Sequence, residues 1–184
     1  SPDNHGVLKE PAAETDWVTI VQPEVETSDY ISDSVDIGFT FNFAGNIGLT
    51  TFAVSPSGWA ILKGNFDDAD GGDPNVHYDN SIAYGALKCV LVFPWWDNLK
   101  TAALGTRTFI NEDVLGNSYR VIDWHAYTNV AHTTSSYEKI RFQAILYESG
   151  NELEFRYSPL STDATGTLTI ADVPDNNDYF QLED

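Results

Sequence analysis

The sequence predicts an all-β protein, an antiparallel two-sheet β-sandwich of jelly-roll-like type, and three observations support this. Residues 35–63 alternate apolar with small or polar residues, and turn residues interrupt them every few positions. A short apolar segment ends in the sequence Phe-Pro-Trp-Trp at residues 93–96, and residues 141–157 have the pattern of a long hairpin. No helical period of useful length and no internal repeat is present.

The first half of the chain yields five predicted strands. The first is Trp17–Gln22, which Pro23 ends because proline cannot donate to a β-ladder. The next three are expected at 35–43, 47–54 and 58–62, and they are joined by turns rich in glycine, serine and proline. Residues 88–93 are apolar without alternation, which predicts a central strand covered on both faces.

The second half of the chain predicts two hairpins followed by two further strands. Strands at 106–110 and 119–127 flank a loop that contains Asp113 and a Gly-Asn pair. In the next hairpin, a two-residue turn at Ser149-Gly150 places Leu146 opposite Leu153, with two further apolar pairs on the same face. The other face is predicted to meet solvent and carries Arg141, Gln143, Glu152, Glu154 and Arg156. The final strands are expected at 166–171 and 178–182.

Length and composition fit one sandwich with a sizeable core. The chain has 184 residues, of which 42% are hydrophobic. We divide it into an acidic N-terminal arm with one strand, residues 1–34, and a β-sandwich domain, residues 35–184. The start at Ser1-Pro2 without methionine fits a processed chain, so export is expected, and no apolar run is long enough to span a bilayer.

The chain is strongly acidic, with 9 basic and 28 acidic residues and a net charge of −19. This charge opposes binding to nucleic-acid phosphates or anionic lipid, so neither is an expected partner. The acids gather at the two ends of the chain and in the loop of residues 67–79. Solvated surface, cation binding and adaptation to a salty medium all remain open explanations of this pattern.

Several short motifs resemble a known family. They are GFTFNFAG at 38–45, FAVSPSGW at 52–59, FPWWDNL at 93–99, and the later NELEFRYSPL, TGTLTI and DYFQL. Their order is similar to that in nidogen-like and related sandwich modules of secreted bacterial surface proteins. The resemblance covers roughly residues 35–182 and implies an extracellular, non-enzymatic module for adhesion or surface architecture. The chain departs from the family pattern at Pro56-Ser57 and in the length of its acidic loop.

The acidic loop offers a candidate calcium site. Alternating carboxylates and glycines provide the oxygen-rich, tightly turning chain that calcium requires, although the distal bidentate glutamate of an EF-hand is absent. Calcium is the one cofactor considered, and a plain solvated loop is the alternative. The candidate ligands are Asp67, Asp68, Asp70, Asp73 and Asn75.

Tryptophans at a strand end offer a candidate polysaccharide site. Trp95 and Trp96, with Trp59 and Trp124, have the aromatic faces on which sugar rings stack, and core packing is the competing use. Because adjacent strand residues point to opposite faces, only one of Trp95 and Trp96 can join a given platform.

The sequence contains no convincing catalytic constellation, and an enzyme is not predicted. The four histidines lack metal-ligand spacing, and His125 is expected to be a surface or hydrogen-bonded structural residue. No nucleophile elbow or phosphate-binding loop is present. Cys89 stands alone in an apolar run, which predicts a small buried side chain.

The N-terminal arm offers a candidate assembly site. Its strand, Trp17, Val18, Thr19, Ile20 and Val21, can add to the open sheet edge of another copy and so build a filament or surface array. Pairing with the chain's own sheet is the alternative. The leading prediction is therefore a secreted structural or adhesive protein whose partners are its own copies or cell-surface components. A calcium-assisted carbohydrate-binding module is the second.

Overall fold

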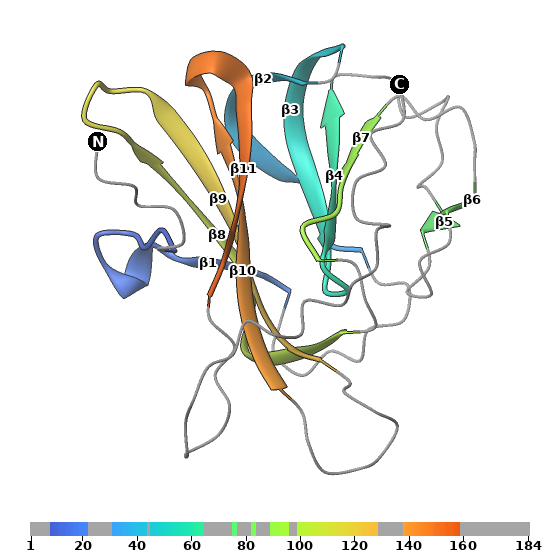
Figure 1. Ribbon diagram of the computed structural model, residues 1–184. Coiled ribbons are helices and arrows are strands. Elements are labelled where there is room, and N and C mark those ends of the chain that lie inside the picture. Colours follow the sequence, from blue (N-terminus) through green and yellow to red (C-terminus); the bar gives the residue numbers. More distant parts are fainter. Residues whose placement is uncertain are drawn as a thin grey trace.

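The alternating segments fold into two antiparallel sheets that face each other (Figure 1). The computed structural model describes residues 8–21, 31–43, 45–64, 75–76, 82–83, 89–95, 99–128 and 138–158. The predicted β-sandwich is confirmed. Within these residues the helical turns are the short 3-10 segments η1 (Glu14–Asp16) and η3 (Ser149–Asn151).

The first sheet has five strands and the second has four. The five-stranded order is β1 (Val18–Val21), β8 (Leu99–Glu112), β9 (Ser118–Thr128), β10 (Glu138–Tyr147) and β11 (Glu152–Tyr157). The four-stranded order is β2 (Val35–Phe43), β3 (Asn46–Ser55), β4 (Trp59–Gly64) and β7 (Cys89–Val92), while β5 (Asn75–Val76) pairs with β6 (Ile82–Ala83). Most consecutive strands are neighbours in one sheet, whereas a jelly roll alternates between sheets.

The predicted register of the last hairpin is confirmed, and its turn is corrected. Leu146 lies opposite Leu153 and Ala144 lies opposite Phe155 in the β10–β11 ladder. The connection is not a two-residue turn, because the last paired residues leave 148–151 as a loop that contains η3. Gly150 adopts a φ of 80° there. The register is unchanged because residues 148 and 151 leave the ladder together.

The strands predicted in the middle of the chain also fall within observed strands. The segment 35–43 coincides with β2, and 47–54, 58–62, 106–110 and 119–127 fall in or overlap β3, β4, β8 and β9. The two strands predicted after residue 165 lie outside the described residues. In the described part of the chain β7 pairs with β4, and it is covered on both faces, as the sequence predicts; its place at the centre of a sheet stays a prediction.

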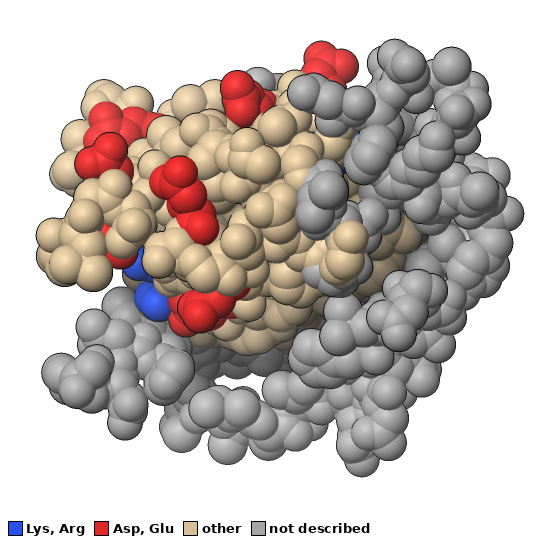
Figure 2. All heavy atoms as spheres, turned by 90° about the horizontal axis from the view of Figure 1, so that it is seen from above, with Lys and Arg blue, Asp and Glu red and all other residues tan. Residues whose placement is uncertain are grey.

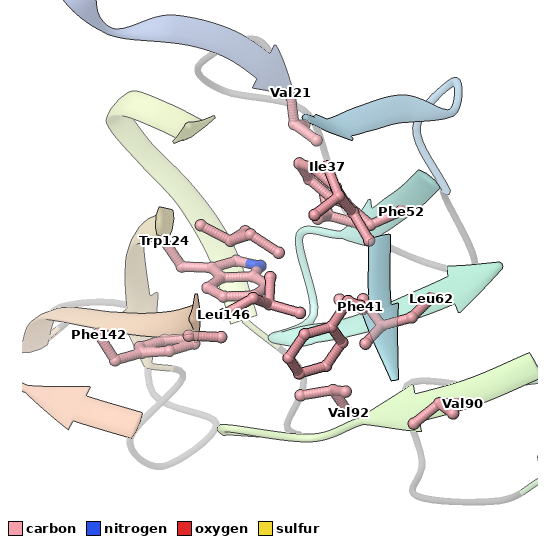
Figure 3. Close-up of a cluster of buried hydrophobic side chains, with 14 of the residues drawn as sticks. Val21, Ile37, Phe41, Phe52, Leu62, Val90, Val92, Trp124, Phe142 and Leu146 are labelled. Carbon is pink, nitrogen blue, oxygen red and sulfur yellow. The ribbon is translucent and has the colours of Figure 1, made fainter. Parts of the chain in front are cut away.

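The faces between the two sheets form the main core (Figure 3). Phe41, Phe52 and Leu62 of the four-stranded sheet pack toward Trp124 and Phe142 of the five-stranded sheet, and all are buried. This is the inner set that the alternation predicts. A second apolar cluster on the outer face of the four-stranded sheet contains Ala53, Trp59 and Ile61, with Leu91 and Phe93 packed against it. It explains why β7 is apolar on both faces.

Polar contacts also join the sheets. The indole Nε1 of Trp124 donates a hydrogen bond of 2.9 Å to the carbonyl oxygen of Ser55, at the end of β3. The guanidinium Nε of Arg120 donates one of 2.9 Å to the carbonyl oxygen of Ile37 in β2. Burial lowers the pKa of Arg120. These bonds satisfy polar groups that the apolar core would otherwise leave without partners.

The turn between β3 and β4 requires the glycine that the sequence places there. Gly58 has a φ of 86°, and a Cβ atom at this position would stand 1.7 Å from the carbonyl oxygen of Trp95. The amide of Trp95 donates a hydrogen bond of 3.3 Å to the carbonyl oxygen of Gly58. The backbones of Gly58 and Trp95 therefore lie in direct contact, which only a residue without a Cβ atom allows.

Loops between neighbouring strands form one end of the sandwich, which Figure 2 views directly. Acidic side chains are spread over its described surface, and basic side chains are visible only at one margin. Asp113 and Glu148 are among the exposed acids of these loops, and the exposed Glu112 ends β8 beside them. Hydrogen bonds from the amides of Leu115 and Asn117 to its carboxylate lower the pKa of Asp113, with those from Asn117 contributing most. It is therefore ionised at neutral pH.

Candidate interaction site beneath the N-terminal arm

The described part of the N-terminal arm, residues 8–21, lies on the outer face of the five-stranded sheet and joins its edge. We call residues 8–21 the docked segment. Its strand β1 pairs antiparallel with β8, with Val18 opposite Thr108 and Thr19 opposite Arg107. An irregularity between Thr19 and Val21 shifts the register and turns Val21 into the core. The predicted assembly residues thus pair with the chain's own sheet.

A buried polar network lies beside the docked segment on three neighbouring strands. We call its members the seat: Arg107 of β8, Asp123 and His125 of β9, and Arg141 and Gln143 of β10. Register brings them together, since Arg107 and Gln143 both lie opposite Asp123, and Arg141 lies opposite His125. Opposite residues have Cβ atoms about 5 Å apart, and these five share the outer face of the sheet.

Asp123 is the centre of the seat and is fully buried. Its carboxylate accepts hydrogen bonds from Arg107 Nε at 3.1 Å and Arg141 Nε at 3.0 Å. It also accepts from Gln143 Nε2 at 3.0 Å and from His125 Nε2 at 2.8 Å. The prediction that His125 is a hydrogen-bonded structural residue is confirmed. Four donors around one carboxylate make this a strongly satisfied buried charge.

The docked segment supplies two carboxylates to the outer sides of the same arginines. Glu10 pairs with Arg141 Nη1 at 2.5 Å, and Glu14 pairs with Arg107 Nη1 at 2.6 Å. Both glutamates are substantially exposed, whereas Arg107 is buried. Each arginine therefore bridges Asp123 below it and a glutamate of the docked segment above it.

Gln143 holds the docked segment by its main chain. The amide of Lys9 donates to Gln143 Oε1, and Gln143 Nε2 donates to the carbonyl oxygen of Lys9, each at 2.8 Å. The side-chain amide of Gln143 thus makes the two hydrogen bonds that a backbone residue makes to its partner in an antiparallel β-ladder. The Lys9 ammonium also lies over the ring of Tyr119, 4.2 Å from its centroid. Burial, more than the nearby charge of Arg156, lowers the pKa of Lys9.

The indole of Trp17 packs against apolar side chains beside the seat. Its ring meets Phe109 edge to face with centroids 4.7 Å apart, and the Arg107 guanidinium lies over it at 4.0 Å. Such cation–π contacts contribute about 0.5 to 2 kcal/mol, depending on desolvation. Trp17 thereby joins an outer cluster that includes Val121 and Ile145.

The sequence-based prediction that this face meets solvent is wrong for residues near the docked segment. Gln143 and Ile145 are fully buried, although both stand on the face opposite the main core. The reason is tertiary, because the docked segment covers this part of the sheet. Glu152 on β11 is exposed, in agreement with the prediction.

Two buried donors of the site have no hydrogen-bond partner in the described part of the chain. Among the described residues, Trp17 Nε1 and Arg141 Nη2 are the buried side-chain donors without a hydrogen-bond partner. A buried polar group without a partner costs about 1 to 3 kcal/mol. The docked segment therefore fills the site without satisfying all of it.

The charges of the seat persist at neutral pH. Burial alone would raise the pKa of Asp123, but the hydrogen bond from His125 and the charge of Arg141 outweigh burial and lower it. Burial alone would lower the pKa of Arg141, but the carboxylates of Glu10 and Asp123 outweigh burial and raise it. Both groups are therefore held in their charged forms.

We expect the contribution of Asp123 to stability to be lost in acid. Because its pKa is lower in the folded chain than its ordinary value of 3.8, the contribution is complete above that value and falls as pH drops through the folded pKa. The facing groups are Arg107, His125 and Arg141, with the carboxylates of the docked segment beyond them. Urea unfolding from pH 7 to pH 2, for the wild type and Asp123→Asn, measures the difference in unfolding free energy. That difference should be constant at neutral pH and shrink below about pH 4. A constant difference throughout would contradict the assignment.

The other predicted site residues are only partly described. Trp95 is half-buried and lies against Phe142 and Tyr157, with ring centroids 6.1 Å and 6.2 Å away, whereas Trp96 lies outside the described residues. Trp59 and Trp124 are buried in the core clusters and present no face to a sugar. Of the candidate calcium ligands, Asn75 lies in β5, and the other four, Asp67, Asp68, Asp70 and Asp73, lie outside the described residues. The side chain of Cys89 also lies outside the description.

Sequence reasoning located the strand of the docked segment but missed its anchors. The signal was present, because the predicted hairpin register already placed Arg141 and Gln143 on one face. Asp123 stands between the core residues Ile122 and Trp124, so alternation places it on that face too. The pattern predicted the hairpin of β8 and β9, but it did not provide the pairing of β9 with β10, which brings these side chains to one point.

In the described part of the chain, no group of three or more histidine, cysteine, aspartate or glutamate side chains is arranged to hold a metal ion. The described residues also contain no helix with the length and apolarity needed to cross a membrane.

Comparison with known proteins gives one match. The family model described as NIDO related matches residues 12–183, a range that includes Glu14, Trp17 and the whole seat. No curated protein and no solved structure shows a significant match to the chain.

Proposed function

Because the chain belongs to the NIDO-related family and folds as a β-sandwich, we propose that it is a secreted, non-enzymatic module with a structural or adhesive role. The family membership supports an extracellular location. The described polar residues support a structural use, because the buried charges of the seat bind one another and the docked segment rather than facing an open cleft. An acidic surface keeps such a module soluble and away from nucleic acid and anionic lipid.

We further propose that the module assembles with copies of itself through its N-terminal arm. The observation that carries this proposal is the way the docked segment binds. It adds a short edge strand to β8 and fixes it with two ion pairs and one indole. All of these contacts join the segment to one face and one edge of the sheet. The same segment of a neighbouring copy can therefore make them equally well, as in β-strand addition.

Electron microscopy and sedimentation of the native full-length chain in calcium-containing buffer test this assembly. Wild type is expected to form filaments, arrays or defined oligomers, and Glu10→Gln/Glu14→Gln to shift the population toward monomer at the same concentration. Glu112→Gln/Glu152→Gln is the matched control, because it removes the same charge from exposed positions at the ends of β8 and β11, outside the site. A wild type that remains monomeric at every concentration would contradict the proposal.

A carbohydrate-binding role is the second candidate, and one observation favours it. Tyr157 is 42% exposed and lies beside the half-buried Trp95, so these two rings form a partly open aromatic pair. Its hydroxyl donates a hydrogen bond of 2.7 Å to the carbonyl oxygen of Pro94, and burial raises the pKa of Tyr157 to about 12. Titration with soluble polysaccharides, with and without calcium, should change tryptophan fluorescence if the pair binds sugar.

A further inference from the structure

The seat carries more positive than negative charge without the docked segment. It contains two arginines against one carboxylate, in a chain whose net charge is −19. The balance is restored by Glu10 and Glu14, which come from the arm. The face of the sheet beneath the arm therefore has the chemistry of a binding surface for an acidic segment, and this chain supplies such a segment itself.

The spacing of the contacts defines what the surface accepts. The arginines stand on β8 and β10, two strand spacings apart, which is roughly 10 Å. Glu10 and Glu14 are separated by four residue steps, and a nearly extended chain covers at most about 14 Å in that number. Pro11 holds the residue before it in an extended conformation. The chain between the two carboxylates is thus long enough for them to reach both arginines, as the two ion pairs show.

The third contact is aromatic. Trp17 follows Glu14 by three residues, at the end of η1, where the amide of Trp17 donates to the carbonyl oxygen of Glu14. This turn places the indole between the Arg107 guanidinium and the Phe109 ring. Recognition therefore needs two carboxylates four positions apart and an indole three positions further on.

We infer that the seat recognises this acidic–aromatic motif in trans and exchanges its own docked segment for the identical segment of a second copy. The inference rests on the proposed self-assembly and names the surface, the ligand and the recognition code. One feature of the docked segment favours exchange. The strand β1 is short and has an irregular register.

A labelled peptide of residues 8–21 tests the inference on the full-length chain. The receptor is Glu10→Gln/Glu14→Gln/Trp17→Ala, which weakens the chain's own segment and leaves every residue of the seat unchanged. Fluorescence anisotropy should show the wild-type peptide binding this receptor at least tenfold more tightly than it binds the wild-type chain. A peptide with both glutamates changed to glutamine should bind at least tenfold more weakly. Arg141→Gln in the receptor should remove that preference.

Equal binding of the two peptides, or no binding to a receptor with a wild-type circular dichroism spectrum, would overturn the inference. If the receptor does not fold, the wild-type chain provides the second measurement. Excess peptide should then accelerate amide hydrogen exchange in residues 8–21 of the chain, and unchanged exchange would overturn the inference. Peptide binding by a chain that sediments as a monomer would support the recognition code while rejecting self-assembly as the function.

Discussion

Replacing Asp123 with asparagine is expected to lower the free energy of unfolding by about 3 to 5 kcal/mol, the range found when one partner of a buried ion pair is removed. Asp123 is fully buried and accepts from two arginines, a histidine and a glutamine. Asparagine has a similar shape but no charge, so the arginines lose their common counter-ion. Its amide group also brings two donors to a place already crowded with donors. Urea unfolding followed by tryptophan fluorescence measures the loss.

Asp113→Asn is the matched control for this experiment. Asp113 also accepts several hydrogen bonds, from the amides of Leu115 and Asn117 and from the Asn117 side chain. Its pKa is also lowered, mainly by the hydrogen bonds from Asn117. The difference is that Asp113 is exposed at the tip of a loop. Its replacement should therefore cost much less than that of Asp123. Equal losses would show that burial does not set the energy of the Asp123 network.

The strands were predictable because their signals are local. Alternation and turn residues specify β2 at residues 35–43, and the apolar face alone fixes the register of Leu146 against Leu153. A slip of one residue would turn that face away from the main core, so the register is strongly determined. The turn after Tyr147 was predicted less well, because a two-residue turn and a four-residue loop are compatible with the same register.

The candidate site was less predictable because it depends on what covers the sheet. Alternation divides the side chains of β10 between two faces, but it does not show that a distant segment buries one of them. Gln143 was therefore assigned to solvent, although residues 8–21 cover it. The strand at Trp17–Val21 was visible from its apolar run. The roles of Glu10 and Glu14 were not visible, because an acidic tail has the same composition whether or not it meets arginines.

The apolar pattern of β7 shows what local sequence can predict about a strand. An apolar strand without alternation is expected at the centre of a sheet, because both of its faces must be covered. In β7, Val90 and Val92 belong to the main core, and Leu91 packs on the outer cluster around Trp59, so both faces are covered. Apolar faces thus reveal that a strand is covered on both sides, but they do not reveal its position in the sheet.

Trp124→Ala is expected to cost about 3 to 5 kcal/mol in the free energy of unfolding, the range for large aromatic truncations in a core. The side chain is fully buried between the sheets and stacks on Phe142, with ring centroids 5.2 Å apart (Figure 3). Its Nε1 bond to the carbonyl oxygen of Ser55 crosses from one sheet to the other. Alanine removes both the packing and the bond, and it leaves a cavity in the centre of the sandwich.

Trp124→Phe separates these two contributions. Phenylalanine keeps the stacking on Phe142 but cannot donate, so the carbonyl oxygen of Ser55 loses this donor. The cost of that lost bond is about 1 to 3 kcal/mol, so Trp124→Phe should retain a clear part of the stability that Trp124→Ala loses. Chemical denaturation of both variants, followed by circular dichroism, measures the two losses. If phenylalanine destabilises as much as alanine, the bond between the sheets, rather than ring packing, governs this position. If it costs nothing, the core tolerates the unpaired carbonyl and packing alone joins the two sheets here.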